Sequence, residues 1–268
     1  MEPTPIETLW AAVRTQSGPA RAWHIDDLYN HQRRYLADLR LIATLAPAGA
    51  ILELGSAPCH MTALLKLSGY PVVGVDVNPD RVGDLIRQLD LDVRRRDIER
   101  SALPFGDDAV ACVMLCETFE HLRIDPQFVL SEINRVLAPG ATLVLTTPNV
   151  YSLPSLGRFL LGRSIADPLE EFGKLRRFGH MGHVREYSAR EVVRLLEASG
   201  LAVSSIDYRY HANARGWKGK LLRVAYRLAP RRFQREIVIV ARKSGDGPRL
   251  APLVPATDAA PLPHSRNG

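Results

Sequence analysis

The sequence predicts an α/β fold built around a mostly parallel sheet of seven strands. Short apolar runs alternate along the chain with amphipathic helical segments, and turns rich in small residues separate them. A strand, a turn, a helix and a second strand follow one another within residues 51–75. Parallel strands need crossover connections of this kind, so the repeated pattern favours a parallel sheet. At 268 residues and 46% hydrophobic composition, the chain is long enough to bury one substantial core.

The elements can be placed in order from their periodicity and their end signals. Residues 1–48 are expected to form a helical lead-in, loose over 1–25 and amphipathic from Asp26 until Pro47 stops it. Connecting helices are expected at 60–67, 126–137 and 189–199, the last with Ser188 and Glu191 as a capping box. The expected strands lie at 51–54, 72–75, 91–94, 109–115, 141–147, 201–208 and 236–241.

The stretch from Ala109 to Leu122 carries the most chemistry. Its first half is apolar without Gly or Pro, as expected of a strand buried on both faces, and its second half supplies Glu117, Glu120 and His121. If a helical turn begins where the strand ends, these three residues share one face. They would then converge at the carboxyl end of a central strand, where open α/β sheets bind ligands. The alternative is a solvated helix start, in which glutamates favour the first turn.

A second candidate site follows the first strand. The turn Gly55-Ser56-Ala57-Pro58-Cys59 lies where a nucleotide-binding fold has its glycine-rich loop. A dinucleotide fingerprint has three glycines and this turn has one, although Gly55 still lets a ligand approach the backbone closely. Asp76, at the end of the second strand, is placed to accept hydrogen bonds from two ribose hydroxyls. The turn alone has little weight, because any such strand–helix unit needs small residues there.

The net charge of +6 is unevenly distributed. Between Tyr208 and Lys243 many Lys and Arg residues stand against a single acidic residue, Glu236, which suggests an anionic partner: phosphate, nucleic acid or a membrane surface. Residues 210–234 can form a basic amphipathic helix within this region. Such a helix either packs on its own domain with a solvated basic face or lies against anionic lipid or phosphate.

Other features of the sequence indicate the cellular environment and the less regular parts of the chain. No run approaches the ~18 apolar residues of a membrane span, and the N-terminus lacks the order of a signal peptide. The three cysteines have no zinc-site spacing, so a reducing cytoplasm is expected. Residues 151–182, with five glycines, are expected to be an insertion on the substrate side of the sheet, and the Pro- and Ala-rich residues 244–268 a disordered tail.

Taken together, the motifs resemble those of the class I S-adenosylmethionine-dependent methyltransferases, which share a Rossmann-like sheet. The resemblance is carried by ILELGSAP, VVGVDVNPD, DIERSALPFGDDAVACVMLCETFEHL and INRVLAPGATLVLTTPN, and it places the domain at residues 49–243. It implies S-adenosylmethionine as cofactor, with the ribose at Asp76 and the adenine beside Asp97. The sequence departs from the family where the usual second and third glycines are Ala57 and Cys59. The implied cofactor-binding residues are Glu53, Gly55, Ser56, Ala57, Asp76, Val77, Asp97, Ile98 and Cys116.

The Glu-x-x-Glu-His pattern is similar to that of two methyltransferase groups, the small-RNA terminal 2′-O-methyltransferases and the ubiquinone-pathway O-methyltransferases. In both groups these residues bind a divalent cation, and the RNA group adds a later histidine. Here His183 occupies the matching position, and His180 competes with it. The resemblance therefore implies Mg²⁺ or Mn²⁺ held by Glu117, Glu120, His121 and His183, with room for two adjacent substrate hydroxyls. Without a metal, His121 or His183 would act as a general base.

These observations lead to an expected function and two alternatives. The expected function is O-methylation of a small molecule, a sugar or polyol that is lipid- or nucleotide-linked, by an enzyme in the cytoplasm or peripheral to the membrane. The first alternative is an RNA ribose 2′-O-methyltransferase, although residues 210–235 offer few aromatic side chains for base stacking. The second alternative is a non-catalytic cofactor-binding protein, which the depleted glycine motif would suit.

Overall fold

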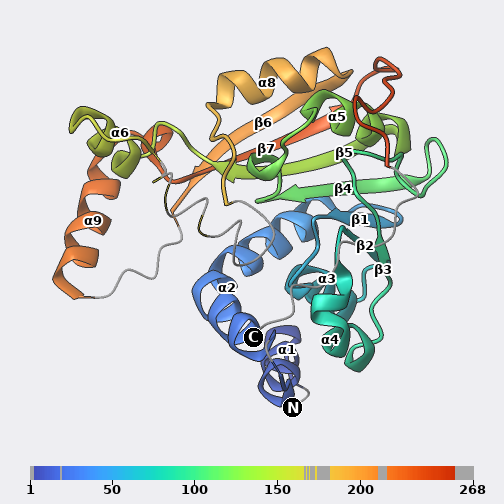
Figure 1. Cartoon of the computed structure of the whole chain (residues 1–268), viewed down its shortest axis with the longest axis horizontal. Helices are drawn as coiled ribbons and strands as arrows, with labels where there is room; N and C mark the ends of the chain where they lie inside the picture. The colour runs from blue at the N-terminus through green and yellow to red at the C-terminus, as the bar shows by residue number, and fades with distance from the viewer. Residues whose placement is uncertain are drawn as a thin grey trace.

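A computed structural model describes residues 3–18, 20–165, 167, 169, 173, 182–210 and 216–256, with the backbone alone at 216–220 and 223. It contains one seven-stranded sheet, ordered β3-β2-β1-β4-β5-β7-β6 (Figure 1). All neighbours are parallel except β7, which runs antiparallel to β5 and β6. The predicted fold class is confirmed. The strands are β1 (Ile51–Leu54), β2 (Val72–Asp76), β3 (Val93–Arg95), β4 (Val110–Cys116), β5 (Leu137–Pro148), β6 (Leu201–Arg209) and β7 (Glu236–Lys243).

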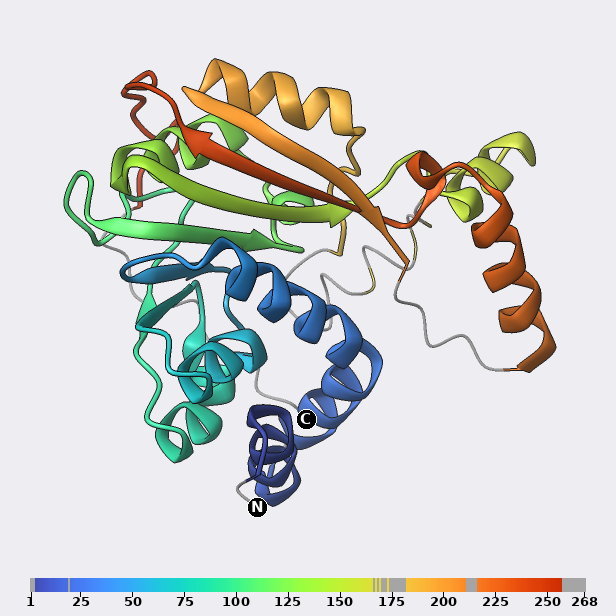
Figure 2. The same cartoon turned by 180° about the vertical axis from the view of Figure 1, so that it is seen from behind.

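Helices cover both faces of the sheet. Helices α1 to α4 lie on one face and α5 and α8 on the other, while α6 and α9 project beyond the sheet where β5 and β6 end and β7 begins (Figures 1 and 2). The helices are α1 (Pro5–Thr15), α2 (Ala20–Leu45), α3 (His60–Leu67), α4 (Gly83–Gln88), α5 (Pro126–Val136), α6 (Leu153–Leu160), α8 (Ala189–Ala198) and α9 (Gly216–Leu228), with short 3₁₀ turns η1 (Pro79–Val82), η2 (Phe119–His121) and η3 (Arg231–Phe233).

Alternation along the central strands divides the interior into two cores. In β4, Cys112 and Met114 pack with α1 to α4, whereas Val113 and Leu115 pack with α5 and α8. Successive side chains of a strand point to opposite faces, so both alternating sets of β4 are apolar because helices cover both sides of the sheet there. The polar groups of this part of the chain therefore come after the strand has ended.

The order of the strands creates one place where a ligand can enter. The chain moves outward from β1 to β2 and β3, then returns to place β4 against the other side of β1. The connections after β1 and after β4 therefore leave in opposite directions, and open α/β sheets bind ligands at such a switch point. Both candidate sites of the sequence, residues 55–59 and residues 117–121, follow these two strands.

The N-terminal lead-in is better ordered than we expected. Helix α1 is fixed by a capping box between Thr4 and Glu7, and its buried residues Leu9 and Val13 belong to the same core as Met114 of β4. The expectation of a loose segment over residues 1–25 is therefore wrong, because α1 buries an apolar face against α2 and α3. Among the described residues no helix is both long and apolar enough to cross a bilayer.

The predicted disordered tail also needs correction. Residues 244–256 follow the surface of the domain: Asn134 donates to the carbonyl of Gly245 at 3.0 Å and accepts from the backbone N–H of Gly247 at 3.1 Å. Farther on, the N–H of Ala256 bonds to the carbonyl of Arg100. The low apolar content of this segment did not prevent order, since its backbone is held by polar groups of the domain. Residues 257–268 lie outside the described residues.

A chain of buried and partly buried hydrogen bonds ties α2 to α3. With Nδ1 of His60 donating to Oδ2 of Asp27 at 2.9 Å, Nε2 of His60 accepts from Nδ1 of His24 at 3.0 Å. Asp27 also accepts from the hydroxyl of Tyr35 at 2.7 Å and from Nδ1 of His31 at 2.9 Å. Helix α3 begins directly after the 55–59 turn, so this network fixes the far end of that turn.

We predict that His24 makes the fold sensitive to acid. Burial, reinforced by the proximity of His60, lowers the pKa of His24 to about 4. An unfolded histidine titrates near about 6.5, so between these values the unfolded state binds a proton that the folded state does not. The free energy of unfolding should fall by up to about 3 kcal/mol as the pH drops through this window. The free energy of unfolding, measured in urea at a series of pH values, should depend less steeply on pH for His24→Gln, which keeps a donor for His60. Equal pH dependence of the two proteins would contradict the prediction.

Candidate functional site

The turn after β1 folds back on the end of β2. The backbone N–H groups of Gly55 and Ser56 both bond to the carbonyl of Val75, and the N–H of Ala57 bonds to Oδ2 of Asp76 at 3.1 Å. Gly55 has φ +71°, a left-handed conformation that favours glycine. A Cβ at Gly55 would lie 2.4 Å from Oγ1 of Thr118, which follows β4. The two predicted loops are thus in contact at the switch point.

The acidic residue of β1 is buried beneath this turn. Glu53 accepts a hydrogen bond from the hydroxyl of Thr62 in α3, and its side chain is almost fully enclosed. Burial raises the pKa of Glu53 to about 8, with Asp76 adding to the effect. A carboxyl in this position can be held neutral, in which state it can donate a hydrogen bond as well as accept one.

Asp76 has a structural role besides the one we expected. Its Oδ2 accepts from Ala57, and its Oδ1 accepts from the N–H of Asn78 at 2.8 Å and lies 3.4 Å from Nη2 of Arg81. An ionised carboxylate has about four acceptor positions, so these contacts leave capacity for a ribose hydroxyl. The same group therefore both shapes the turn and is available to a ligand.

The remaining predicted cofactor residues lie around the same edge of the sheet. Val77 is exposed directly after β2, and Cys116 is partly buried at the end of β4. Asp97 accepts from the N–H of Glu99 at 3.0 Å, while the neighbouring Ile98 packs against the core. These residues come from the segments after β2, β3 and β4, so the structure gathers the predicted set at the carboxyl ends of adjacent strands.

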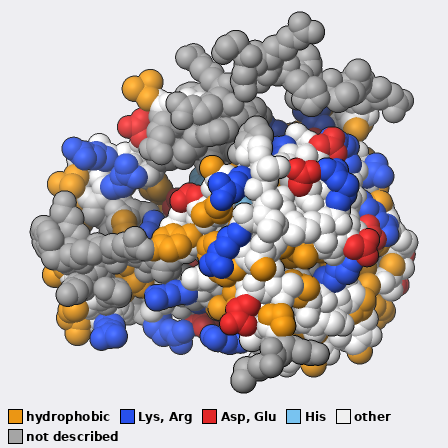
Figure 3. Space-filling view, turned by 90° about the horizontal axis from the view of Figure 1, so that it is seen from below, with side chains coloured by type: hydrophobic (Ala, Val, Ile, Leu, Met, Phe, Trp, Pro, Cys, Tyr) orange, Lys and Arg blue, Asp and Glu red, His pale blue; other side chains and the backbone are white. Residues whose placement is uncertain are grey.

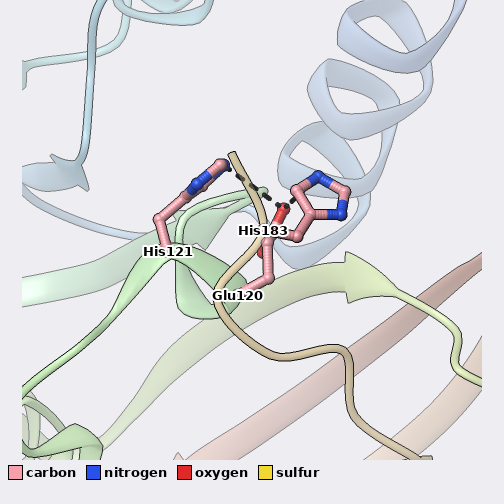
Figure 4. Close-up of side chains that lie close together, drawn as sticks. All are labelled: Glu120, His121 and His183. Atoms are coloured by element: carbon pink, nitrogen blue, oxygen red, sulfur yellow. Dashed lines mark ion pairs between the residues drawn. The ribbon is translucent and has the colours of Figure 1, made fainter. Parts of the chain in front are cut away.

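A buried carboxylate is the centre of the second site. Glu120 is 1% exposed, and its Oε2 accepts from the hydroxyl of Thr147 at the end of β5, at 3.0 Å. Its Oε1 accepts no hydrogen bond from any described residue. Nε2 of His121 lies 3.9 Å and Nε2 of His183 lies 4.0 Å from this same oxygen (Figure 4). One ligand atom from each of the three residues lies within 4.8 Å of the others.

The two imidazoles are oriented by hydrogen bonds on their opposite sides. Nδ1 of His121 donates to the carbonyl of Gly182 at 2.8 Å, and Nδ1 of His183 lies 3.2 Å from Oε1 of Glu186. In the neutral rings these contacts place the proton on Nδ1, so each Nε2 presents a lone pair toward Glu120. Three electron-rich atoms then face one another, an arrangement that a cation would stabilise. Bonds of this kind on the far nitrogen are typical of metal-binding histidines.

The backbone explains why residues so far apart in sequence meet. The carbonyl of Glu120 accepts from the N–H groups of Val184 and Arg185, at 2.9 and 3.3 Å, which brings the segment after His183 onto η2. Phe119, fully buried, packs 4.7 Å from the ring of Tyr187 and fixes the same pairing from inside. His180, the competing histidine of the sequence analysis, lies outside the described residues.

Glu117 does not join this group, contrary to the sequence analysis. Residues 117–121 do not form an α-helical turn: Glu117 has φ +51°, and only the single 3₁₀ turn η2 follows. Its carboxylate instead pairs with Arg34 of α2 at 3.0 Å and accepts from Thr146 at 3.2 Å. The expected common face of the three residues is therefore wrong, because the reversal at Glu117 turns its side chain toward α2.

Burial and neighbouring charges perturb the titration of the site. Burial raises the pKa of Glu120 to about 8, and the Glu117 carboxylate adds to the effect. Burial alone would lower the pKa of His183, but the hydrogen bond to Glu186 and the charge of Glu120 outweigh it and raise the pKa. A carboxyl with a pKa as strongly raised as that of Glu120, at the edge of a sheet, is characteristic of functional sites.

Several residues of the site gave no usable signal in the sequence. Arg34 lies on a long helix, and nothing local marks it as the partner of a residue 83 positions later, which only tertiary packing reveals. The sequence marks Thr147 only as the last residue of the predicted strand at 141–147. Glu186 could have been found, since its position three residues after His183 suggests a carboxylate that orients an imidazole.

We predict that Gly55 cannot be replaced without loss of stability. Gly55→Ala should lower the free energy of unfolding by about 1–3 kcal/mol, because alanine is strained at φ +71° and its Cβ would clash with Thr118. Adding Thr118→Ala should recover part of this loss, since it removes the Oγ1 and Cγ2 atoms that the new Cβ would meet but not the backbone strain. A double-mutant cycle in urea unfolding measures the coupling. Additive losses would show that the clash does not matter.

The comparisons with known proteins agree with this geometry. A family model described as a methyltransferase domain matches residues 29–206. A protein of Mycolicibacterium smegmatis, named a probable S-adenosylmethionine-dependent methyltransferase, is 30% identical over 180 residues. That match covers 67% of this chain and 62% of the relative, so the chain spans less than two thirds of the relative's length.

Solved structures share the fold. A SAM-dependent methyltransferase from Archaeoglobus fulgidus aligns with a TM-score of 0.56 at 20% identity, over 82% of this chain and 99% of that one. The N-methyltransferase NodS of Bradyrhizobium japonicum, in complex with S-adenosyl-L-homocysteine, aligns with a TM-score of 0.52 at 16% identity, over 91% and 100%. At these identities the matches establish the architecture alone. The chain therefore belongs to the methyltransferase domain family, with the Rossmann-like fold of the class I S-adenosylmethionine-dependent methyltransferases.

Proposed function

We propose that this protein transfers the methyl group of S-adenosylmethionine to a hydroxyl group, assisted by a divalent cation at Glu120, His121 and His183. The observation that carries the proposal is the buried Oε1 of Glu120, which accepts no hydrogen bond from any described residue and faces the Nε2 atoms of both histidines. An isolated buried carboxylate is costly unless a positive charge compensates it. A bound Mg²⁺ or Mn²⁺ would supply that charge.

The cofactor would bind across the carboxyl ends of β1 and β2. Gly55 keeps the turn clear of side-chain atoms, and Asp76 offers a carboxylate at the position where Rossmann-like folds hold a ribose. The family match supports this assignment, and the NodS structure, which contains S-adenosyl-L-homocysteine, supports it through the shared fold. The methyl group would then face the segment that follows β4.

Acceptance of a hydroxyl follows from the chemistry of the donor set. A neutral hydroxyl is a poor nucleophile, whereas a divalent cation makes it more acidic. The new O–CH₃ bond forms as the S–CH₃ bond of the sulfonium breaks, which releases S-adenosyl-L-homocysteine, and the hydroxyl proton leaves to solvent. Glu120 supplies the charge, and Gly182 and Glu186 keep the imidazoles in the required tautomer. Without a cation, His121 or His183 would serve as the general base.

We propose a sugar or polyol as the acceptor. Hard divalent cations bind six or more oxygen or nitrogen ligands, and three protein residues leave positions for other groups. Two adjacent hydroxyls of one small molecule can fill two such positions. RNA ribose offers a similar pair, so it remains the competing acceptor. Methyl transfer from labelled cofactor to sugar, catechol and RNA acceptors would decide between these classes, and transfer to RNA alone would reject the small-molecule assignment.

The metal requirement gives the sharpest test of the mechanism. Glu120→Gln keeps the shape of the side chain but removes its charge, so activity should fall at least about a hundredfold while S-adenosylmethionine still binds. Excess EDTA should abolish turnover of the wild type, and Mg²⁺ or Mn²⁺ should restore it. Glu197→Gln, an exposed glutamate on α8, is the matched control and should be unaffected. Full activity in excess chelator would reject the metal and leave histidine base catalysis.

Cofactor binding can be tested separately. Asp76→Ala should weaken S-adenosylmethionine binding by about 1–3 kcal/mol, because it removes the ribose acceptor and also releases the N–H of Ala57. Asp76→Asn keeps one acceptor oxygen and should lose less. Isothermal titration calorimetry, with the thermal unfolding of each variant as the check on folding, provides the measurement. Unchanged affinity in a folded Asp76→Ala protein would show that the ribose binds elsewhere.

A further inference from the structure

Two helices at one end of the molecule expose large apolar side chains to solvent. In the segment that includes α6, Phe159, Leu160 and Leu161 are 74%, 83% and 75% exposed. In α9, Leu221, Val224 and Leu228 are 63%, 50% and 82% exposed. The spacing of the second set, at i, i+3 and i+7, places it on one helical face. Contiguous exposed apolar patches of this kind mark interaction sites on globular proteins.

Both sets lie at the same end of the molecule. Helix α6 follows β5, and α9 connects β6 to β7, yet both helices project beyond the sheet at that end (Figures 1 and 2). We call these six apolar residues and their flanking arginines the α6–α9 surface. Tyr226, on the inner side of α9, is buried and stacks on Tyr210 with ring centroids 4.2 Å apart. That contact attaches α9 to the domain by one side, so its apolar outer face is left uncovered.

The charged residues of the two helices are all basic. Arg158 and Arg163 flank the apolar residues of α6, Arg227 and Arg232 flank those of α9, and all four are exposed. Neither helix contains an aspartate or a glutamate in its sequence. In Figure 3 blue and orange side chains are intermixed at the left-hand end of the molecule, where these helices lie. A partner that matches this surface would offer apolar groups to the exposed leucines and anionic groups to the flanking arginines.

We propose that the α6–α9 surface docks on a lipid bilayer containing anionic headgroups. The apolar side chains would enter the boundary between headgroups and acyl chains, and the arginines would lie at the level of the phosphates. A second copy of this chain fits poorly, because a two-fold interface would place arginine against arginine. RNA also fits poorly, since it would leave the exposed leucines in water.

This docking has a consequence that rests on the proposed function. Helix α6 begins at Leu153, shortly after Thr147, the residue that donates to Glu120. The surface and the catalytic edge are therefore joined by one short connection. A protein docked through α6 and α9 would hold that edge close to the bilayer. The acceptor would then be the polar headgroup of a lipid, a sugar or polyol carried at the membrane surface.

Vesicle binding tests the docking without any measurement of activity. Wild-type protein should co-sediment with vesicles of phosphatidylcholine and phosphatidylglycerol at least about tenfold better than with phosphatidylcholine alone. The triple variant Phe159→Ser, Leu160→Ser, Leu161→Ser should lose about tenfold in binding, and so should Arg158→Gln with Arg163→Gln and Arg227→Gln. All variants should keep S-adenosylmethionine affinity, which verifies that they are folded.

Matched control variants test whether the loss of vesicle binding is specific to the α6–α9 surface. Leu253→Ser with Val254→Ser removes exposed apolar residues elsewhere, and Arg190→Gln with Arg194→Gln removes exposed arginines of α8. Both controls should bind vesicles like the wild type. The proposal is overturned if the wild type ignores anionic vesicles, or if the apolar triple variant binds them unchanged. It is also overturned if that variant instead converts a dimer to a monomer in sedimentation velocity. Since these readouts do not use methyl transfer, their failure is distinct from failure of the proposed function.

Discussion

The burial of β4 on both faces is the constraint on which the rest of the structure depends. Its side chains from Cys112 to Leu115 alternate between two apolar cores, so no polar group can be placed within it at tolerable cost. The chain must reach the end of the strand before it can present a carboxylate. Polar residues therefore collect at the edge where β1 and β4 end together, and open α/β sheets bind ligands at such a switch point.

Within that edge the decisive feature is a carboxyl group that is buried away from solvent. Glu120 is enclosed by the turn at Phe119 and by the segment after His183, which bonds to its carbonyl. Its Oε1 atom faces two imidazoles, and the Nδ1 proton of each ring points away from it. Such an arrangement is electrostatically unfavourable without a bound cation and would be stabilised by one. In the proposed function the same burial strengthens the interaction of Glu120 with a cation, because a charge acts more strongly where water is excluded.

The two sites and the α6–α9 surface are related by topology. Strand β5 lies next to β4, supplies Thr147 to the Glu120 site, and leads directly into α6. On the other side of β5, the antiparallel strand β7 follows α9 in the chain. Helix α6 thus extends the strand that supplies Thr147, and α9 leads into the strand that pairs with it. Substrate delivery and catalysis are expected to share this end of the molecule.

The sequence by itself determined the elements whose signals are local. Alternation of apolar runs and amphipathic helices predicted the seven strands, and Ser188 with Glu191 predicted the start of α8, where the capping box is present. It also placed His183 near Glu120, through the resemblance to metal-binding methyltransferases, and the structure brings the two together.

Tertiary structure decided what depends on contacts between distant residues. Glu117 pairs with Arg34 because the backbone reverses at φ +51°, and helical spacing could not indicate that reversal. The order of residues 244–256 likewise depends on Asn134, a residue of α5 that is remote in sequence. Periodicity reports which face of an element is apolar, whereas the partner of a charge or of a backbone N–H is fixed only when the elements have packed.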